Sequence, residues 1–319
     1  MNNKNGYPLV YFVILNWNQP DLTLACFESL SELDYPNYKV VLVDNGSTDN
    51  SVALIREAYP EVILIEPGQN LGYSAGNNVG IQYAMEHGAE YVYLLNNDTA
   101  VDKYMLLRMV EASEATPDAG MVGPTIYYFD PPDVLWSAVN TIDWPRGQII
   151  RHDLNKVWPV APDDTPSQQV DYVDSCAILV KREVIEKIGM LDESFFINFD
   201  DADWNIRARQ VGYKVIHVPT ARVWHKVSAA MGQASPATTY YMTRNILLFL
   251  WKHTRGLTRL KATGYVLTRT LRTVMAWTFK PQYREFRRKR NANLYALRDA
   301  MLGRFGPMGA DVRRTCFGK

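Results

Sequence analysis

The most constraining feature of this sequence is the alternation of short apolar runs with segments whose apolar residues recur at helical spacing. Val10–Leu15 is β-branched and aromatic, and Leu22–Leu33, after a polar turn, has apolar side chains at helical intervals. Val40–Val43 and Ser51–Ala58 repeat this order of strand and helix. Strands joined through helices favour right-handed crossovers. The alternation therefore predicts an α/β fold with a mostly parallel sheet and helices on both faces.

Two stretches interrupt this order. Residues 70–80 are predicted to be a Gly/Asn-rich loop that leads into a helix ending near Met85. Residues 130–169 are rich in Pro, Asp and Trp and weakly periodic, which predicts a long excursion over the site instead of a separate core. The remaining elements are expected as strands at Val62–Ile65, Tyr91–Leu95, Asp171–Lys181 and Gly212–Val218, and as helices at Met105–Ala112, Arg182–Ile188, Tyr240–Trp251 and Tyr265–Phe279.

Charge divides the chain near the point where its texture changes, after Ala237. The 319 residues carry no net formal charge, yet residues 252–319 contain 17 Lys and Arg and only three acids. Residues 1–251 therefore hold 17 bases and 31 acids. We expect an α/β domain over residues 1–237 and a basic amphipathic helical extension over residues 238–319.

Cysteine usage and hydropathy exclude several classes of protein. Three widely spaced cysteines, Cys26, Cys176 and Cys316, make neither a disulfide framework nor a Cys-rich zinc site, so a reducing, cytoplasmic setting is expected. The N-terminus is expected to enter the first strand without an apolar signal region. No apolar run in the sequence approaches the roughly 20 residues of a spanning helix.

The predicted strand at Tyr91–Leu95 ends abruptly in Asn96, Asn97 and Asp98. The carboxyl edge of a sheet is where α/β proteins bind ligands, and Mg²⁺ and Mn²⁺ prefer oxygen donors that they share with substrate phosphates. We therefore interpret Asp98 as a metal ligand. The structural alternative is a helix N-cap at Asp98 or Thr99.

Two further polar segments suit a nucleotide. Asp44 ends a strand and can accept a hydrogen bond from a base or a ribose hydroxyl, whereas Ser47 and Asp49 are expected to serve the turn and the next helix cap. The glycines of residues 70–80 allow either close approach to a nucleotide or a simple turn. This segment lacks the G-x-G-x-x-G order and any Walker lysine, which disfavours a Rossmann dehydrogenase.

Three carboxylates, Asp200, Asp201 and Asp203, follow an aromatic run at a helix start. The helix dipole stabilises acids there, so one or two of them can be purely structural. Crowded carboxylates in partly apolar surroundings also suit a general base that acts on a sugar hydroxyl. His225 follows the late strand; alone it is more often a packing residue than a ligand, and Asp98 and the acids favour the second interpretation.

Taken in order, these segments resemble the family 2 glycosyltransferases, inverting enzymes of the Rossmann-like GT-A fold that use nucleotide-sugar donors. The matching segments are residues 10–18, 44–49, 70–78, 96–99, 199–207 and His225. The resemblance implies Asp201 as the catalytic base and a divalent metal, Mg²⁺ or Mn²⁺, at Asp98 and His225. Asn96 stands where the family has an acid, and it contributes a carbonyl oxygen at most. The resemblance implies donor contacts at Asn16, Asp44, Asn70, Gly72, Gly76 and Asn77. Asn97, which lies beside Asn96 at the end of the predicted strand Tyr91–Leu95, is added to this set.

The resemblance also implies a function. The Asn-Asn-Asp-Thr segment is similar to that of rhamnosyl- and galactofuranosyltransferases, which implies transfer from a dTDP- or UDP-sugar to a glycan or lipid-linked acceptor in cell-surface polysaccharide synthesis. Acceptor contacts are expected at Asp200, Asp203, Trp204 and Trp144, although packing in a surface loop would equally explain Trp144. A catalytically inactive binding module of the same fold is the alternative, because of Asn96. A nucleotidyltransferase is disfavoured, because residues 16–20 contain no base.

Scattered bases usually form a solvated helix face, but the composition of the basic tail fits an anionic partner better. Its bases are interleaved with Trp251, Tyr265, Trp277, Phe279 and Tyr283, a pattern typical of interfacial helices. The expected partner is the anionic inner face of the cell membrane, where the protein would be peripheral. Nucleic acid binding and self-assembly are the competing interpretations, and the oligomeric state is left open.

Overall fold

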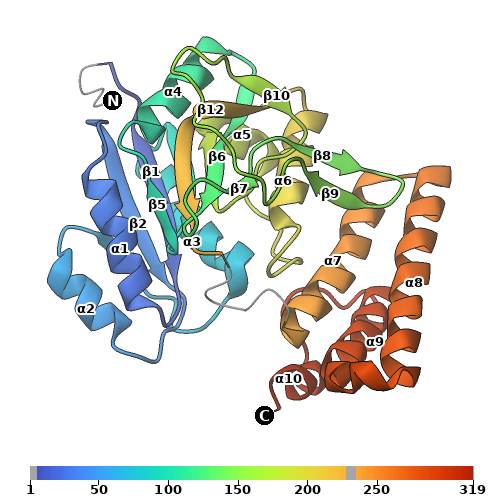
Figure 1. The fold of residues 1–319 in the computed structure, drawn as a ribbon. Coiled ribbons are helices and arrows are strands. Elements are labelled where there is room, and N and C mark those ends of the chain that lie inside the picture. The colour runs from blue at the N-terminus through green and yellow to red at the C-terminus, as the bar shows by residue number, and fades with distance from the viewer. Residues whose placement is uncertain (1–5, 228–234, 319) are drawn as a thin grey trace. The chain divides into compact units, whose positions relative to one another are not determined.

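The computed structural model describes residues 6–227 and 235–318 (Figure 1). These residues form two compact units. The first unit comprises the chain up to Thr141 together with Arg151–Leu191 and Trp204–Val227. The second comprises Ile142–Ile150, Asp192–Asp203 and the chain after Val227, so it contains the predicted helical extension and two earlier segments.

A mixed, mostly parallel sheet forms the centre of the first unit. The strand order is β10-β12-β6-β11-β4-β1-β2-β3, with β5 added to β12 and β7 added to β6. Strand β1 pairs in parallel with β2 and β4, and β2 pairs in parallel with β3, whereas β11 runs antiparallel between β4 and β6. The strands are β1 (Val10–Asn16), β2 (Tyr38–Asp44), β3 (Ile63–Ile65), β4 (Tyr91–Asn96), β5 (Thr99–Val101), β6 (Ala119–Tyr128), β7 (Leu135–Ser137), β10 (Gln168–Val170), β11 (Ala177–Lys181) and β12 (Lys214–His225).

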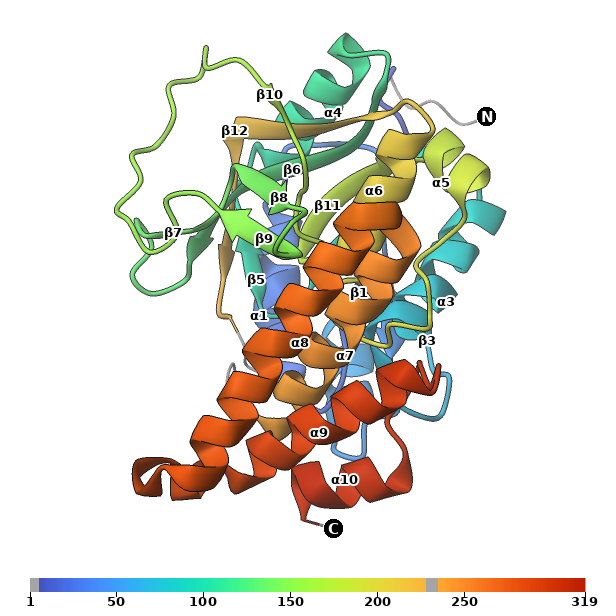
Figure 2. The same cartoon turned by 90° about the vertical axis from the view of Figure 1, so that its right-hand side faces the viewer.

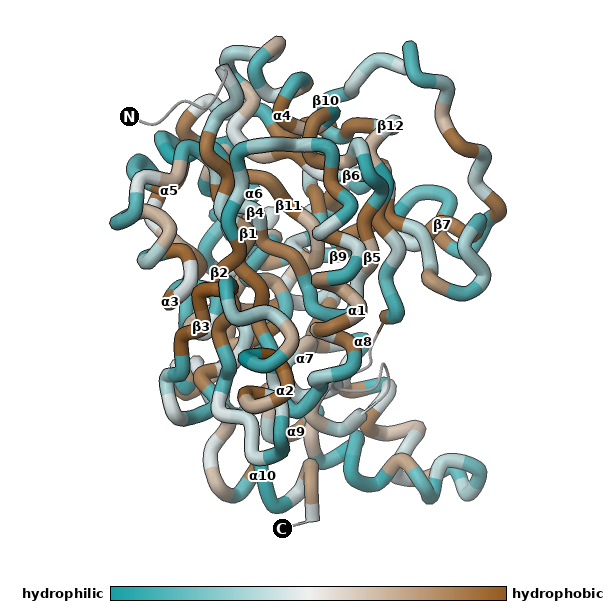
Figure 3. Tube along the Cα trace, turned by 90° about the vertical axis from the view of Figure 1, so that its left-hand side faces the viewer, coloured by the Kyte–Doolittle hydropathy of each residue, from teal (hydrophilic) through white to brown (hydrophobic). Residues whose placement is uncertain are grey.

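Helices cover both faces of this sheet, as the alternation predicted. Side chains of α1, α2 and α4 share one core with Phe12 and Ile14, and side chains of α3, α5 and α6 share the other core with Tyr11 and Val13. Successive residues of β1 therefore point to opposite faces, and its apolar run is buried on both. Strands β1, β2 and β3 are hydrophobic over much of their length in Figure 3. The helices are α1 (Pro20–Ser31), α2 (Ser51–Ala58), α3 (Gly72–Glu86), α4 (Met105–Ala115), α5 (Arg182–Ile188) and α6 (Asp200–Gln210).

The predicted loop over residues 70–80 is wrong, because most of it is the first half of α3. The glycines there serve close packing of the helix on the sheet. A Cβ added at Gly76 would lie 2.7 Å from Leu15 Cδ1, and one at Gly80 would lie 2.4 Å from Val13 Cγ1. Glycine lowers intrinsic helix propensity, and tertiary contact overrides that preference here.

Two other expectations need correction. Asp98 and Thr99 cap no helix, because β5 begins at Thr99 and α4 begins only at Met105. The late strand does not end at Val218 but continues as β12 to His225, with a register shift after Val218 that accommodates Pro219. The excursion contains β7, β10 and a two-stranded sheet of β8 (Asn140–Asp143) and β9 (Gln148–Arg151).

The second unit is mainly helical. Helices α7 (Pro236–His253), α8 (Gly256–Phe279) and α9 (Arg287–Met301) lie side by side, and the short helices η1 (Pro281–Phe286) and α10 (Ala310–Phe317) pack against them (Figure 2). Its small core includes Tyr240 and Tyr241 of α7, Ala292 and Ala296 of α9, and Val312 of α10. Among the described residues no helix is long and apolar enough to cross a bilayer. All three cysteines are buried.

Candidate active site

The carboxyl ends of β1, β2 and β4 bring together polar side chains that are far apart in the sequence. Asn16 is the register partner of Asp44, and Asn96 is the partner of Leu15. Asn16 and Asp44 are almost fully buried, and Asn16 Nδ2 donates a 2.8 Å hydrogen bond to Asp44 Oδ1. Parallel pairing of buried strands therefore places two predicted donor-binding residues in direct contact.

Asp44 also organises the turn that follows β2. Its Oδ2 accepts from Ser47 N at 2.9 Å and its Oδ1 accepts from Ser47 Oγ at 2.6 Å. Gly46 has a φ of 75°, and a Cβ there would lie 2.6 Å from the backbone of Gln69. The turn thus needs glycine both for its conformation and for its close contact with the neighbouring chain. Ser47 serves the turn, as predicted, and Asp49 Oδ1 accepts from Ser51 N where α2 begins.

A polar residue that the sequence reasoning missed joins this end of the sheet. Thr23, fully buried in α1, donates through Oγ1 to Asn16 Oδ1 at 2.8 Å and accepts from Asn97 Nδ2 at 3.0 Å. A chain of hydrogen bonds therefore runs from Asp44 through Asn16 and Thr23 to Asn97. A single threonine inside an amphipathic helix gives no signal in the sequence that distinguishes it from a solvent-facing residue.

The segment before α3 is attached to the end of β2 by another missed residue, Asn45. Asn45 Oδ1 accepts from Leu71 N at 2.8 Å, and its Nδ2 donates to Gly72 O at 3.1 Å. Asn70 Oδ1 accepts from Gly72 N at 2.8 Å. Asn77 Nδ2 donates to Tyr73 O within α3. Asn70 and Gly72 thus lie beside Asn45, at the end of β2.

Asp98 and His225 are brought together by antiparallel pairing of β5 with β12. His225 is the register partner of Thr99, and Lys226 N donates to Asp98 O at 2.9 Å. Asp98 Oδ1 lies 3.0 Å from His225 Nε2, and both side chains are less than a tenth exposed. The predicted adjacency of these two residues, about 130 positions apart in the sequence, results from β12 continuing past Pro219.

Asp98 and His225 lie close together without forming a hydrogen bond to each other. Among the described residues neither Asp98 Oδ1 nor His225 Nδ1 has a hydrogen-bond partner. Asp98 Oδ1, buried and without a hydrogen bond, faces His225 Nε2 as two ligands that converge on a cation would. No group of three or more His, Cys, Asp or Glu suited to a metal is found in the described part of the chain, so any ion here would take its other ligands from substrate, water or carbonyl oxygens.

The ring of His225 is oriented by Trp136, which the sequence analysis did not assign. The two rings meet edge to face, with centroids 4.9 Å apart and planes at 89°. The guanidinium of Arg151 lies 4.4 Å from the Trp136 centroid on the face of the indole. The predicted excursion thus supplies the surroundings of the candidate metal ligand.

Asp174 holds Arg151 in place from the other side. It is 3% exposed, forms an ion pair with Arg151, and accepts hydrogen bonds from Ser137 Oγ and from Tyr172 Oη at 3.0 Å. Burial raises the pKa of Asp174, but Arg151 and these hydrogen bonds together lower it by more than burial raises it. The pKa of Asp174 therefore lies below its usual range. Asp174 is therefore an ionised anchor for the residues around His225.

The predicted acidic cluster occupies the first turn of α6, and its members have different surroundings. Asp200 is 2% exposed and Asp203 is fully buried, whereas Asp201 is partly exposed. Asp203 Oδ1 lies 2.6 Å from Lys252 Nζ and 2.8 Å from His253 Nε2, at the end of α7. Of the three acids, Asp201 is thus the one whose side chain is open to solvent.

The two tryptophans predicted to contact an acceptor have packing partners. Trp204 is fully buried in the core shared with α3 and α5, and its Nε1 donates to Gly189 O at 2.9 Å. These contacts are those of a core residue instead of a surface that an acceptor reaches. Trp144 is stacked on Phe249, with ring centroids 5.6 Å apart and planes at 8°.

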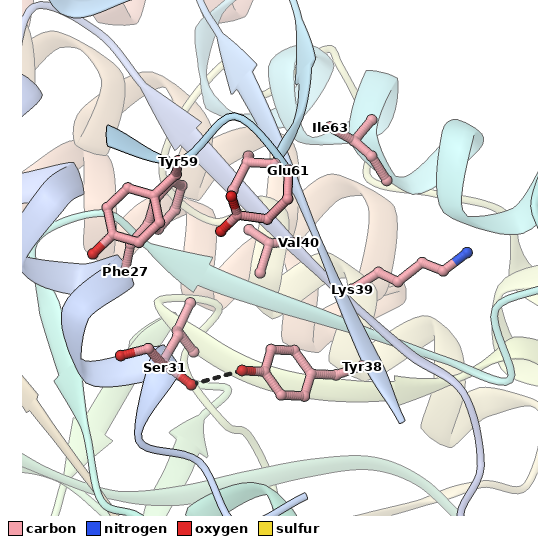
Figure 4. A pocket seen from close by; sticks show the side chains of 10 residues that line it. Phe27, Ser31, Tyr38, Lys39, Val40, Tyr59, Glu61 and Ile63 are labelled. Atoms are coloured by element: carbon pink, nitrogen blue, oxygen red, sulfur yellow. Dashed lines mark hydrogen bonds between the residues drawn. The ribbon is translucent and has the colours of Figure 1, made fainter. Parts of the chain in front are cut away.

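A pocket of about 470 Å³ lies at the opposite edge of the sheet (Figure 4). Its walls come from α1, from the chain before β3 and from the first residues of β2 and β3, where Tyr38 Oη donates to Leu30 O at 2.9 Å. It therefore lies at the amino ends of the parallel strands, away from the edge that carries Asn16 and Asp44. No site residue predicted from the sequence is among the described residues that line it.

Two relatives of this chain are rhamnosyltransferases. The chain is 26% identical over 252 residues to "dTDP-rhamnosyl transferase RfbF" of Shigella flexneri, covering 76% of this chain and 80% of that one. It is 27% identical over 232 residues to "N-acetylglucosaminyl-diphospho-decaprenol L-rhamnosyltransferase" of Mycobacterium tuberculosis, covering 66% of this chain and 74% of that one.

Solved structures share the fold at low sequence identity. A mannosyltransferase from Pyrobaculum calidifontis, solved with GDP-Man and Mn²⁺, has a TM-score of 0.57 at 15% identity, covering 93% of this chain and 88% of that one. GalNAc-T7, solved with UDP, GalNAc and Mn²⁺, has a TM-score of 0.62 at 14% identity, and the match covers 96% of this chain and 60% of that one. Both support the GT-A fold. Residues 11–189, more than half of the chain, match the model of glycosyl transferase family 2, so the chain belongs to that family.

Proposed function

We propose that this glycosyltransferase moves a sugar, with inversion at the anomeric carbon, from a dTDP- or UDP-sugar to a hydroxyl of a glycan or lipid-linked acceptor. The observation that carries the proposal is the buried Asp98–His225 pair, whose facing atoms are 3.0 Å apart without a hydrogen bond. The pair follows β4 and ends β12, and β4 is paired with β1, whose end holds Asn16 against Asp44. This edge suits a nucleoside diphosphate with a divalent ion.

The protein's own residues would divide the donor between them. Asp44 and Asn16 would bind the base and ribose through hydrogen bonds, and the segment of Asn70 and Gly72 would line the nucleotide. Asp98 and His225 would hold Mg²⁺ or Mn²⁺. When bound, such an ion neutralises charge on the leaving diphosphate. The mannosyltransferase and GalNAc-T7 described above were both solved with Mn²⁺, which supports this assignment.

We assign the general base to Asp201, from its place in the family motif and from its partial exposure. Its carboxylate would take the proton of the acceptor hydroxyl while that oxygen forms a bond to the anomeric carbon. The bond between that carbon and the diphosphate oxygen breaks on the opposite face, and the electron pair leaves with the nucleoside diphosphate. General-base catalysis of this kind contributes about 10²–10⁴-fold to rate.

A dTDP-sugar, with rhamnose as the first candidate, is the donor we favour. The two relatives named above are rhamnosyltransferases, and one of them is named for a diphospho-decaprenol acceptor. Asn96 in place of an acid removes one negative ligand, which would make the metal site weaker. It also motivates the rival function, an inactive binding module of the same fold.

The test is turnover of a panel of dTDP- and UDP-sugars with Mn²⁺ or Mg²⁺, read by which nucleoside diphosphate is released. Release of dTDP from dTDP-rhamnose by the wild type, lost in Asp201→Asn with unchanged donor affinity, is the expected result. Wild-type turnover in Asp201→Asn would refute the base. Donor binding without any turnover in the panel would establish the binding module instead.

We also propose that the second unit docks the protein on an anionic membrane surface. Helix α8 has an exposed apolar stripe at helical spacing: Leu257, Leu260, Leu271, Met275 and Phe279, which are 48–79% exposed. Exposed apolar side chains on one face of a helix rich in bases are typical of interfacial helices. At the membrane the protein would be peripheral on the cytoplasmic face, near a lipid-linked acceptor.

Liposome flotation tests this docking. Binding to vesicles that contain anionic lipid, weakened by salt and by Leu260→Glu with Met275→Glu, is the expected result. Substitution of the buried Val266 is avoided because it would perturb folding. The control is Thr258→Glu, which adds one charge at an exposed position of the same helix that lies off the apolar stripe. Equal binding to neutral and anionic vesicles would refute the electrostatic part of the proposal.

A further inference from the structure

The segment that leads into α6 has an unusual backbone. Phe196, Asn198 and Phe199 have φ angles of 65°, 67° and 69°, the left-handed region that residues with a side chain rarely adopt. Three such residues in four positions persist only where their surroundings hold them. They immediately precede Asp200 and Asp201, so the chain enters the first turn of α6 from a conformation that has to be maintained by contacts.

The carboxamide of Asn245 supplies those contacts. Its Nδ2 lies 2.8 Å from Phe195 O, 2.7 Å from Ile197 O and 3.0 Å from Asn198 O, all in hydrogen-bond geometry. Asn245 is fully buried in α7. One amide nitrogen, with two protons shared among three carbonyls, thus contacts the backbone on both sides of the left-handed Phe196 and the carbonyl of the left-handed Asn198.

Arg244 fixes which way this carboxamide points. Its Nε donates to Asn245 Oδ1 at 2.9 Å, so the amide oxygen faces the guanidinium and the amide nitrogen must face the segment. Arg244 is itself fully buried, and it donates to Gly306 O at 2.7 Å and to Phe195 O at 3.2 Å. The pair therefore forms a preset donor group directed at residues 195–198.

A backbone hydrogen bond connects the segment to the first turn of α6, which carries the acids. Asp203 N donates to Phe199 O at 2.9 Å, which makes the carbonyl of Phe199 part of the first turn. We propose that Asn245, oriented by Arg244, is a positioning residue that sets the location of the Asp201 carboxylate. This inference rests on the proposed role of Asp201 as the base. Asn245 touches backbone and not the reacting groups, so its effect passes through the segment 195–199.

Two variants of the full-length protein test the proposal. Asn245→Asp keeps the shape but directs an oxygen at three carbonyl oxygens, and Asn245→Ser keeps one donor as a milder change. The matched control is Thr243→Ala, which removes a 2.7 Å hydrogen bond from Thr243 Oγ1 of the same helix to Asn293 but does not face the segment. Turnover is measured as dTDP release from dTDP-rhamnose with Mn²⁺.

We expect Asn245→Asp to lower kcat about 10–100-fold, since a displacement of about 1 Å costs about 10²-fold in such a site, while the donor KM stays within about twofold. Asn245→Ser should fall between it and the wild type, and Thr243→Ala should keep wild-type kcat. If the role of Asn245 were purely structural, the Tm of Asn245→Asp would fall, as would the Tm of the control. The kcat of Asn245→Asp would then not fall selectively while its donor KM stayed constant.

Hydrogen exchange of the amides of residues 195–201 gives a second readout that does not depend on turnover. Faster exchange there in both Asn245 variants, but not in Thr243→Ala, is the expected result. Wild-type kcat and wild-type exchange in Asn245→Asp would overturn the proposal. If Asp201→Asn keeps full turnover, the proposed function fails as a separate result, and the exchange data still show whether Asn245 holds the segment.

Discussion

Replacing Asp203 by Asn should destabilise the second unit without altering substrate binding. The carboxylate is fully buried and accepts contacts from Lys252 at 2.6 Å and His253 at 2.8 Å. Hydrogen bonds that involve a charged group contribute about 1.5–3 kcal/mol each, and removing one partner of a buried ion pair costs about 3–5 kcal/mol. Because Asn retains one acceptor oxygen, we expect Asp203→Asn to cost about 2–3 kcal/mol.

The assay is urea unfolding of the wild type and of Asp203→Asn, with Asp192→Asn as the matched control. Asp192 contacts the same lysine at 2.5 Å, but its side chain is 28% exposed, so its loss should cost about 1 kcal/mol or less. A double-mutant cycle with Lys252→Met should give a coupling to Asp203 of about 0.5–3 kcal/mol. An Asp203→Asn protein as stable as the wild type would refute this reasoning, and a raised acceptor KM in it would support a direct acceptor contact.

Three further results are expected. Burial lowers the pKa of His217 to about 4, whereas this histidine has a pKa near 6.5 in the unfolded chain, so its contribution to stability is complete above pH 6.5 and is lost as the pH falls to about 4. His217→Gln should therefore make the free energy of unfolding depend less on pH between 6.5 and 4. An unchanged pH dependence would contradict this prediction. Gly80→Ala should cost about 1–3 kcal/mol by urea unfolding, because its Cβ would lie 2.4 Å from Val13 Cγ1, whereas Gly264→Ala, with open space around it, should not destabilise. Asp98→Asn should raise the Mn²⁺ concentration needed for half-maximal turnover at least about tenfold, and a metal-independent rate that survives chelation would exclude the assigned ion.

Much of the sheet and its edge could be predicted from local pattern. Strands such as Val10–Asn16 are buried on both faces, so their apolar runs are continuous, and the polar residues that end them mark the carboxyl edge. Asp44 and Asp98 are recognisable for that reason. The helix at α3 was mispredicted because Gly76 and Gly80 lower helix propensity, and only their contact with β1 shows why they are glycines.

The sequence by itself determined the alternating α/β order, the basic tail and the polar strand ends, because these depend on periodicity and composition over neighbouring residues. Tertiary structure alone decided that β12 continues past Pro219 to set His225 against Asp98, and that Asn245 of α7 holds the backbone before Asp201. These contacts join residues some 45 to 130 positions apart. They depend on strand register and on a backbone conformation that local preferences oppose, and neither leaves a trace in the pattern of neighbouring residues.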